Sequence, residues 1–259
     1  MRTIIFIHLF FFGTQVAFTQ EIRIMTYNIH HGEDMKAKID IAQIADVINR
    51  YKPDIVALQE VDSVTNRNGK VDQMAELGRL TNMHQAYGRN FAYDGGSYGL
   101  GILSRFPIAE TKNYRLPYYP DDANGDTRLM LMTTIQVSKN TQIHFGTVHL
   151  DYKQASQRKL QAADMLLQLE KAGNIPTIIT GDFNAVPDEE AITVIENQFT
   201  ELINNDTAFT YPADTPTKKI DYIFLSKKAK WKPVRQEVIE EKNASDHRPV
   251  LGVVRLQKK

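Results

Sequence analysis

The feature that most constrains the fold is an order of elements that occurs twice: an apolar strand, an amphipathic helix, and a second apolar strand that leads into an acid. The first unit is predicted to contain a strand over 22–28, a helix over 40–51 and a strand over 54–59, followed by Glu60. The second is predicted to contain a strand over 142–149, a helix over 154–172 and a strand over 176–180, followed closely by Asp182. Right-handed crossovers bring the ends of such strands to one edge, where ligands of α/β folds gather.

The rest of the chain adds strands more often than helices, which predicts an α/β protein with two mixed sheets packed face to face and helices on the outer faces. Further strands are expected over 100–104, 129–137, 220–225 and 250–256, and further helices over 71–81 and 188–198. Helical periodicity predicts two buried faces. These are Ile41, Ile44, Ala45 and Ile48 in the first helix, and Leu160, Ala163, Leu166 and Leu167 in the long helix of the second unit.

The composition is that of a soluble globular protein and indicates one domain after residue 19. Of the 259 residues, 42% are hydrophobic and 24% are charged, which is ordinary for such proteins. The formal net charge is zero, so the molecule as a whole does not attract nucleic acid or an anionic membrane, although this leaves room for a local anion site. The chain has no cysteine, and core packing rather than disulfides must therefore stabilise it.

The first 19 residues have the pattern of a signal peptide. Arg2 supplies a positive start, residues 4–12 form an apolar run interrupted only by His8, and small residues lead to Ala17-Phe18-Thr19 as a cleavage signature. A buried first strand is the alternative interpretation of the same run. We expect a secreted or periplasmic protein whose mature domain comprises residues 20–259.

Polar side chains follow most of the predicted apolar strands, at the point where each strand ends. Alternation along an extended chain would point Asp182 and Asn184 the same way and turn Phe183 into the core. An aspartate in such a position is commonly a turn former or a helix cap. The other strand-end groups are Asn28, Glu60, His149, Asp221, Asp246 and His247. Carboxylates and amides together suit Mg²⁺, Mn²⁺ or Ca²⁺, so one shared metal site is expected.

A series of motifs carries a family resemblance over almost the whole mature chain. In order, they are "TYNI", "ALQEVD", "YGLGILSRFP", "TR", "GTVHLD", "TGDFNAVP", "IDYIF" and "SDHRPV", from Thr26 to Val250. The series resembles the endonuclease/exonuclease/phosphatase superfamily, which has the DNase I-like fold. Arg67, Asp72 and Gln73 are similar to residues of a small secreted bacterial branch. The resemblance implies a four-layer α/β sandwich that hydrolyses phosphoesters with a divalent metal, usually Mg²⁺.

The resemblance also implies roles for metal and water. Glu60 resembles the main metal-binding acid of the family, with Asn28 beside it, and Asp246 resembles the acid that completes or flanks that site. Asp182 matches the residue that orients or deprotonates the attacking water. Each assignment is carried over from the motif that contains the residue.

A second group is implied to contact the phosphate. Asn184 matches the amide that holds a phosphate oxygen, and Arg128 resembles an arginine that contacts the phosphate. His247 resembles the histidine on the phosphate, with Asp221 as its carboxylate partner. His149 stands where the family places a second histidine or, in some branches, a tyrosine. An imidazolium and an arginine can stabilise charge on the transferring group, so the residue types suit the assignments.

Three further residues are candidates for substrate contacts: His30, Arg67 and Tyr98. Position 30 is an acid in some family members, so His30 puts a second metal at that position in doubt; the residue contacts substrate or simply caps its loop. Arg67 either binds a second phosphate or pairs with Asp62 or Asp72. No sequence feature indicates an obligate protein partner, and a monomer is expected.

Three functions are compatible with these residues. The first is a secreted phosphoesterase, of the diester or monoester type, that acts on a small or lipid-derived phosphoester. The second is a secreted endonuclease or exonuclease for DNA or RNA. Zero net charge and the lack of a long basic loop favour the first. The third is an inactive binding module on the same fold, which the complete set of catalytic residue types disfavours.

Overall fold

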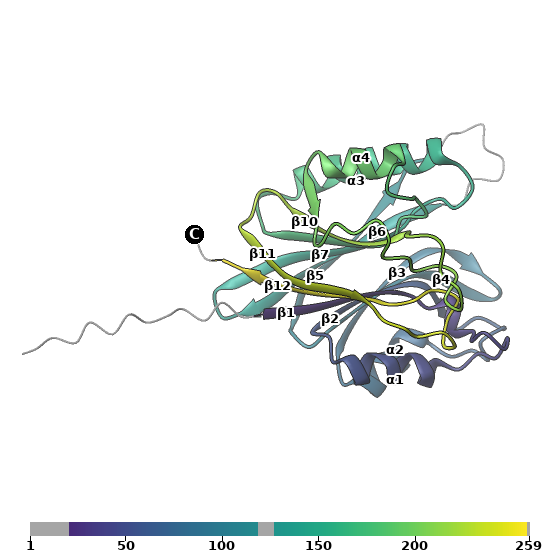
Figure 1. The fold of residues 1–259 in the computed structure, drawn as a ribbon. Helices are drawn as coiled ribbons and strands as arrows, with labels where there is room; N and C mark the ends of the chain where they lie inside the picture. Colours follow the sequence, from purple (N-terminus) through teal and green to yellow (C-terminus); the bar gives the residue numbers. More distant parts are fainter. Residues whose placement is uncertain (1–20, 119–126, 258–259) are drawn as a thin grey trace, which may run out of the picture.

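Residues 21–118 and 127–257, which the computed structural model describes, form two six-stranded sheets packed face to face (Figure 1). Helices α1 (Ile41–Tyr51) and α2 (Gln73–Thr81) cover the outer face of one sheet. Helices α3 (Ala155–Lys171) and α4 (Glu190–Glu196) cover the outer face of the other. The predicted four-layer α/β sandwich is therefore confirmed.

Each sheet is built around one of the two predicted strand–helix–strand units. The first sheet has the order β11-β12-β1-β2-β4-β3 and the second β5-β6-β7-β8-β10-β9. The strands of the first sheet are β1 (Glu21–Asn28), β2 (Ile55–Ser63), β3 (His84–Tyr93), β4 (Gly96–Ser104), β11 (Trp231–Val238) and β12 (Val250–Leu256). Those of the second are β5 (Ile108–Leu116), β6 (Arg128–Ser138), β7 (Thr141–His149), β8 (Thr177–Asp182), β9 (Phe199–Glu201) and β10 (Asp221–Ser226).

The parallel pairs at the sheet centres bring the strand ends together. Strand β1 pairs in parallel with β2, with Asn28 opposite Gln59, and β7 pairs in parallel with β8, with His149 opposite Asp182. A buried hydrogen bond of 2.8 Å from Gln59 Nε2 to Thr147 Oγ1 ties the two sheets to each other near these ends. The polar residues at the ends of both pairs therefore meet at one edge of the sandwich.

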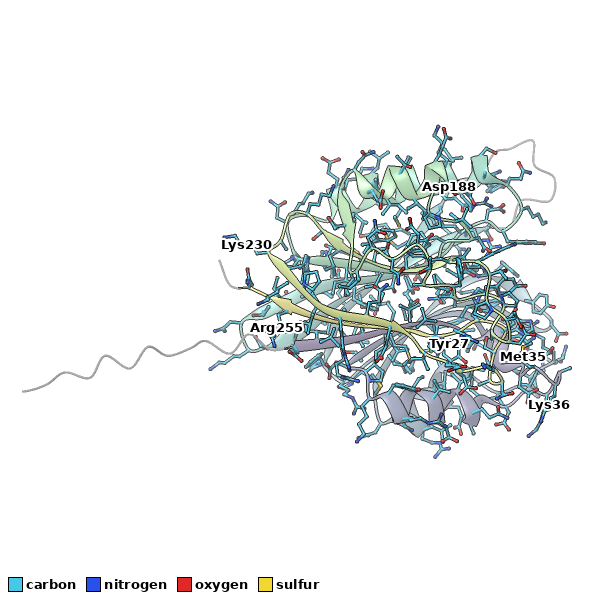
Figure 2. All side chains as sticks on the ribbon, viewed as in Figure 1. Tyr27, Met35, Lys36, Asp188, Lys230 and Arg255 are labelled. Atoms are coloured by element: carbon cyan, nitrogen blue, oxygen red, sulfur yellow. The ribbon has the colours of Figure 1, made fainter. Side chains whose placement is uncertain are left out.

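The space between the sheets is filled by apolar side chains, and a second apolar layer lies under each helix pair. Figure 2 shows side chains filling the molecule from one helix layer to the other. Tyr27 of β1, labelled there, is fully buried in the apolar layer between the first sheet and α1. Because these layers hold the strands on both faces, the strand ends are rigidly placed.

The buried face of α3 differs from the predicted one. Leu166 is buried as expected, but Leu167 is 55% exposed and Ala163 is exposed, while Ala162 and Met165 are buried. The buried face is shifted around the helix relative to the predicted one, because two polar residues also face inward. Arg158 Nη2 pairs with Glu189 at 2.6 Å, and Gln161 Oε1 accepts from the backbone of Asp151 at 2.9 Å. An apolar pattern alone cannot reveal a helix face that is partly polar.

Four strands were not predicted from the sequence: β3, β5, β9 and β11. All four are the edges of their sheets. Most side chains of β5 and β11 are exposed and polar, because an edge strand has only one neighbour and polar residues discourage pairing with other chains. Without an apolar run, these strands lack the signal on which the prediction depended.

The expected signal peptide over 1–19 lies outside the described residues, so the division at residue 19 stays a prediction. Among the residues that are described, no helix combines the length and the apolar composition needed to cross a bilayer.

Replacing Phe183 by alanine is expected to lower the free energy of unfolding by about 3–5 kcal/mol. Phe183 is fully buried, and its ring packs edge-on against Tyr222 and Phe224, with centroid distances of 5.6 and 5.3 Å. Urea unfolding monitored by circular dichroism measures the loss. The matched control is Phe209→Ala, because Phe209 is 37% exposed. Equal losses in the two variants would contradict the anchoring role of Phe183.

Candidate active site

Asn28, at the end of β1, lies between two acids that come from different sheets. Its side-chain amide donates to Glu60 Oε1 at 3.1 Å and to Asp182 Oδ2 at 3.0 Å. Asn28 is fully buried. Glu60 lies within a register shift between β2 and β4, and its φ of 60° is unusual for a residue with a side chain. The bulge turns the carboxylate of Glu60 toward the same edge as Asp182.

His247 lies between two buried carboxylates. Its Nδ1 is 2.9 Å from Asp221 Oδ2, and its Nε2 is 3.7 Å from Asp182 Oδ2. Burial would lower the pKa of His247, but Asp221 and Asp182 together raise it well above its usual range. The imidazole is therefore charged at neutral pH, and Asp221 fixes its orientation.

Asp182 contacts Asn28, His149 and His247. Burial raises the pKa of Asp182, Asp221 raises it further, and the opposing effect of His247 is smaller than their sum. One oxygen, Oδ1, accepts from the backbone N–H of Asn184 at 2.8 Å, while Oδ2 faces Asn28 and the histidines. A carboxylate with a raised pKa, held in place by one oxygen, is suited to accept a proton through the other.

His149 faces Asp182 from the neighbouring strand end, with its Nε2 3.5 Å from Asp182 Oδ2. Burial, reinforced by Arg128, lowers the pKa of His149 to about 3, so this imidazole is neutral where His247 is charged. Arg128 is itself buried and donates from Nη1 to the backbone carbonyl of His149 at 3.4 Å. The two predicted phosphate-side residues at β6 and β7 are therefore neighbours.

Asn184 reaches the site by a different route from the predicted one. Strand β8 ends at Asp182, and Asn184 has a φ of 50°, so extended-chain alternation does not apply to it. The Asp182 carboxylate holds the backbone of Asn184 in a tight turn, and Asn184 Nδ2 donates to the carbonyl of Leu150 at 3.1 Å. Asn184 thus lies beside the site, with one amide hydrogen already used.

Asp246 lies next to His247 in the chain, and the side chain of Ser245 contacts it. Ser245 Oγ donates to Asp246 Oδ1 at 3.4 Å and to the backbone carbonyl of Asn28 at 2.7 Å. Among the described residues, two clusters have ligand atoms close enough for a metal ion: Asp182, Asp221 and His247, and Glu60 with His30 and His31. Asp246 is in neither cluster.

A cavity of about 340 Å³ opens beside Glu60 and His149. Arg128 and His31 also line it, together with an aromatic wall and Arg67. The wall consists of Phe91, Tyr93, Tyr98 and Tyr152. Tyr98 stacks on Phe91 with a centroid distance of 5.2 Å, and burial followed by the charge of Glu60 raises the pKa of Tyr98 well above its usual range. Tyr98 therefore offers a neutral hydroxyl.

Arg67 pairs with Asp62, which decides between the two predicted partners. Arg67 Nε and Nη2 lie 2.6 and 2.8 Å from the two oxygens of Asp62, a fully buried acid. Asp72 instead caps α2 by accepting from the backbone of Ala75. The guanidinium also lies 4.6 Å from the centre of the Tyr93 ring. Arg67 is thus a fixed part of the cavity wall, and a second phosphate would have to share it with Asp62.

Four residues of the site were not singled out from the sequence: His31, Phe91, Tyr93 and Tyr152. His31 follows His30 directly, and its Nδ1 lies 3.8 Å from Glu60 Oε2. The repeated histidine in "NIHHG" was a usable signal, because imidazoles are common metal ligands. The tyrosines gave no such signal, since exposed tyrosines are frequent on protein surfaces.

The donors at the centre fit a divalent cation. Burial disfavours a charged Glu60, but hydrogen bonding from His31 and Asn28 and the charge of His247 outweigh it and hold the pKa of Glu60 far below its usual range. Glu60 is therefore an ionised oxygen ligand, with the imidazoles of His30 and His31 nearby. Carboxylate and imidazole donors together match the ligands of metal sites.

Comparisons with known proteins agree with the fold. The family model described as "Endonuclease/Exonuclease/phosphatase family" matches residues 25–247. The protein YbhP of Escherichia coli K12, described as uncharacterized, is 24% identical over 249 residues, which cover 90% of this chain and 96% of YbhP. A functionally unknown conserved protein from Enterococcus faecalis has a TM-score of 0.76 at 23% identity, covering 91% of this chain and all of its own. A mannosyl-6-phosphatase from Bacteroides thetaiotaomicron has a TM-score of 0.71 at 19% identity, covering 92% of this chain and all of its own.

Proposed function

Because the chain belongs to the endonuclease/exonuclease/phosphatase family, whose members hydrolyse phosphoesters, we propose that it is a divalent-metal-dependent hydrolase of a compact phosphoester. One observation carries the proposal. Glu60, Asp182 and His247, which are far apart in the sequence, converge around the buried Asn28. This arrangement supplies a metal ligand, a base and an acid within one site.

Each residue has a chemical task in this proposal. A bound divalent cation would be held by Glu60 and Asn28, and it would stabilise charge on the phosphoryl oxygens. Asp182 Oδ2 accepts a proton from the attacking water, and Asn28 keeps that oxygen in place. The charged His247, oriented by Asp221, donates a hydrogen bond to the phosphate.

Arg128 and Asn184 complete the phosphate contacts in the proposal. Arg128 lies in the cavity wall beside His149, where a guanidinium can bind two phosphate oxygens. Asn184 has a second amide hydrogen beyond the one that it gives to Leu150. His149, which is neutral, can accept or donate one hydrogen bond at the same place without adding charge.

The cavity favours a small substrate over a polymer. Its volume of about 340 Å³ is at the lower end of the range for small-molecule sites. Tyr93 and Tyr152, both exposed at the surface, can stack on a sugar or another ring. The structural neighbour that is a mannosyl-6-phosphatase supports a phosphorylated sugar as one such substrate. The zero net charge disfavours the alternative, a nuclease that tracks a long polyanion.

We also propose that residues 1–19 direct secretion and that the mature protein acts as a monomer outside the cytoplasm. The apolar run over 4–12 and the small residues before Gln20 support the first part. Amino-terminal sequencing of the protein recovered from the periplasm or the medium tests it, and a chain that still begins at Met1 would contradict it.

A substrate panel with controlled metal tests the proposed function. The purified protein is assayed with Mg²⁺ or with EDTA against hexose 6-phosphates, inositol phosphates, bis-(p-nitrophenyl) phosphate, sphingomyelin, RNA and plasmid DNA. We expect metal-dependent release of phosphate or alcohol from a small ester. Plasmid nicking at low enzyme without activity on any small ester would favour the nuclease instead. An EDTA-resistant activity would contradict metal dependence.

Tyr152→Ala is expected to lower kcat/KM for a ring-bearing phosphoester about two-fold or more, because a contact of an aromatic ring is typically worth about 0.5–1.5 kcal/mol. Tyr152 is 58% exposed, so its removal should not destabilise the fold. Steady-state kinetics on a hexose phosphate measures the change. Glycerol phosphate, which lacks a ring, is the matched control. Equal losses on both substrates would contradict stacking by Tyr152.

A further inference from the structure

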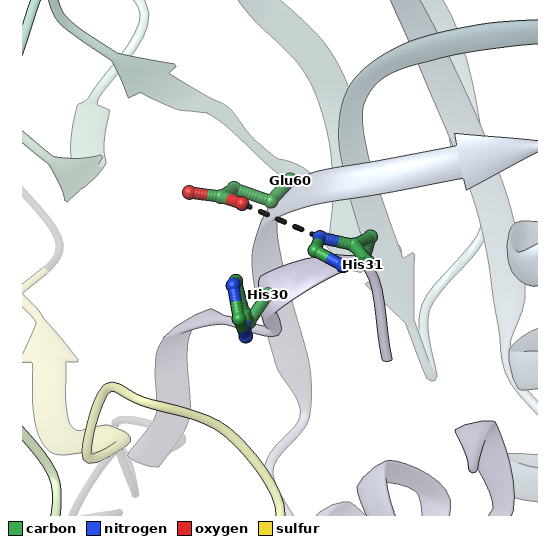
Figure 3. Close-up of side chains that lie close together, drawn as sticks. All are labelled: His30, His31 and Glu60. Atoms are coloured by element: carbon green, nitrogen blue, oxygen red, sulfur yellow. Dashed lines mark ion pairs between the residues drawn. The ribbon is translucent and has the colours of Figure 1, made fainter. Parts of the chain in front are cut away.

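His30, His31 and Glu60 form a second group of metal-ligand types beside the catalytic residues. One ligand atom from each lies within 4.8 Å of those of the other two. The side chains converge from the short helical turn η1 (His30–Gly32) and from β2, as Figure 3 shows, with the dashed line joining Glu60 to His31. The rings of His30 and His31 are 4.4 Å apart between centroids. This spacing is small enough for one ion to contact all three side chains after minor rotations.

The backbone holds all three residues in an uncommon conformation. His30 and His31 each have a φ of 45°, and Glu60 has a φ of 60°. Residues with a side chain seldom adopt positive φ, and such positions concentrate at functional sites. Hydrogen bonds hold the turn: Gly32 donates to the Ile29 carbonyl at 2.7 Å, and the His30 backbone donates to Asn28 Oδ1 at 3.0 Å. The fold thus places two adjacent imidazoles beside one carboxylate.

The other nitrogen of His31 already has a carboxylate partner. Its Nε2 lies 3.4 Å from Glu33 Oε2, while its Nδ1 faces Glu60. The buried Gln73 also holds this turn, because its Nε2 donates to the backbone carbonyl of His31 at 2.6 Å and its Oε1 accepts from the backbone of Asp62. Metal-binding histidines almost always have their second nitrogen on a carboxylate, a carbonyl or a water. Glu33 fills that role here and aims Nδ1 at Glu60.

The donor types decide which metal suits this group. Imidazole nitrogens favour zinc and other transition metals, whereas Mg²⁺ takes oxygen ligands almost exclusively. We propose that His30, His31 and Glu60 bind one transition-metal dication, such as Zn²⁺ or Co²⁺, more tightly than Mg²⁺. His31, with Glu60, lines the catalytic cavity, so the ion would face a bound substrate. This inference deepens the proposed function, since Glu60 belongs to the same centre, but metal binding is measured without turnover.

Titration calorimetry on the full-length protein, freed of metal with EDTA and dialysed, tests the proposal. We expect Zn²⁺ and Co²⁺ to bind with a dissociation constant at least ten-fold below that of Mg²⁺. His30→Asn and His31→Gln should each weaken Zn²⁺ binding at least ten-fold and leave Mg²⁺ binding within about three-fold. Bound Co²⁺ should also give visible absorption bands that His31→Gln alters. His84→Asn is the matched control, because His84 is exposed on β3.

Glu33→Gln keeps the histidines and removes only the orienting charge. It should weaken Zn²⁺ binding by about 10–100-fold, and it serves as the second variant if a histidine variant loses its circular dichroism spectrum. Unchanged Zn²⁺ affinity in His30→Asn and His31→Gln, or a wild-type protein that prefers Mg²⁺, would overturn the proposal. Either outcome leaves the proposed hydrolase intact, whereas a protein that binds Zn²⁺ through these residues but hydrolyses no phosphoester would refute the hydrolase alone.

Discussion

Asp182→Asn is expected to lower the turnover of the preferred phosphoester by about 10²–10⁴-fold, the usual contribution of general acid–base catalysis. The amide keeps the shape of the carboxylate but cannot accept a proton from water. The carboxylate of Asp182 contacts Asn28 and the backbone of Asn184, and it is not proposed to hold the phosphate. The loss should therefore appear in kcat more than in KM. Steady-state kinetics with saturating metal measures both constants. Turnover within ten-fold of wild type would contradict the role of Asp182 as base.

The same variant has a stability signature that separates catalysis from folding. The pKa of Asp182 is raised by burial and by Asp221, so the folded state holds a proton that the unfolded state releases. This contribution to stability is present below the unfolded pKa and is lost as the pH rises through the folded pKa. Without metal, Asp182→Asn should therefore be at least as stable as wild type at pH 8. A large fall in its thermal midpoint at pH 8 would contradict this electrostatic description.

His247→Ala is expected to abolish measurable turnover and to lower the free energy of unfolding by about 3–5 kcal/mol, the usual cost of breaking a buried ion pair. His247 is buried between Asp221 and Asp182, and its removal leaves both carboxylates without their cation. Because the pKa of His247 is raised in the folded state, its contribution to stability is fully present below the unfolded pKa and is lost as the pH rises through the folded pKa. The loss of stability in the variant should therefore be largest at mildly acidic pH and should shrink at alkaline pH. Urea unfolding at several pH values and steady-state kinetics measure the two effects.

A double variant provides the control for His247. Asp221→Asn in the His247→Ala background removes the isolated buried carboxylate, so it should recover part of the lost stability without recovering any turnover. If the double variant is less stable than His247→Ala by the full cost of an independent mutation, Asp221 and His247 do not form a coupled pair.

The sequence predicted the two strand–helix–strand units because their strands are apolar and their helices amphipathic. It did not predict the edge strands β5 and β11, whose side chains are largely exposed. The prediction of the buried face of α3 was also wrong, because Arg158 and Gln161 are buried through polar contacts that no apolar pattern reveals. Apolar periodicity thus identifies the centre of each layer better than its boundary.

The site was predictable where residues follow strands, and less so where the backbone turns. Asn28, Asp182 and His149 lie at strand ends, as expected. Asn184 and Glu60 have positive φ, which an alternating pattern cannot predict, and the bulge at Glu60 depends on pairing with a strand far along the chain. The ion pair of Arg67 with Asp62 likewise required the folded chain.

Anomalous diffraction from a crystal soaked with Mn²⁺ and phosphate tests most directly whether these residues form one hydrolytic centre. We expect a manganese peak within coordinating distance of the Glu60 carboxylate, and a phosphate that contacts both this ion and His247 beside Asp182. A manganese ion bound only at surface acids, or a phosphate held away from Asp182 and His247, would contradict the proposed centre.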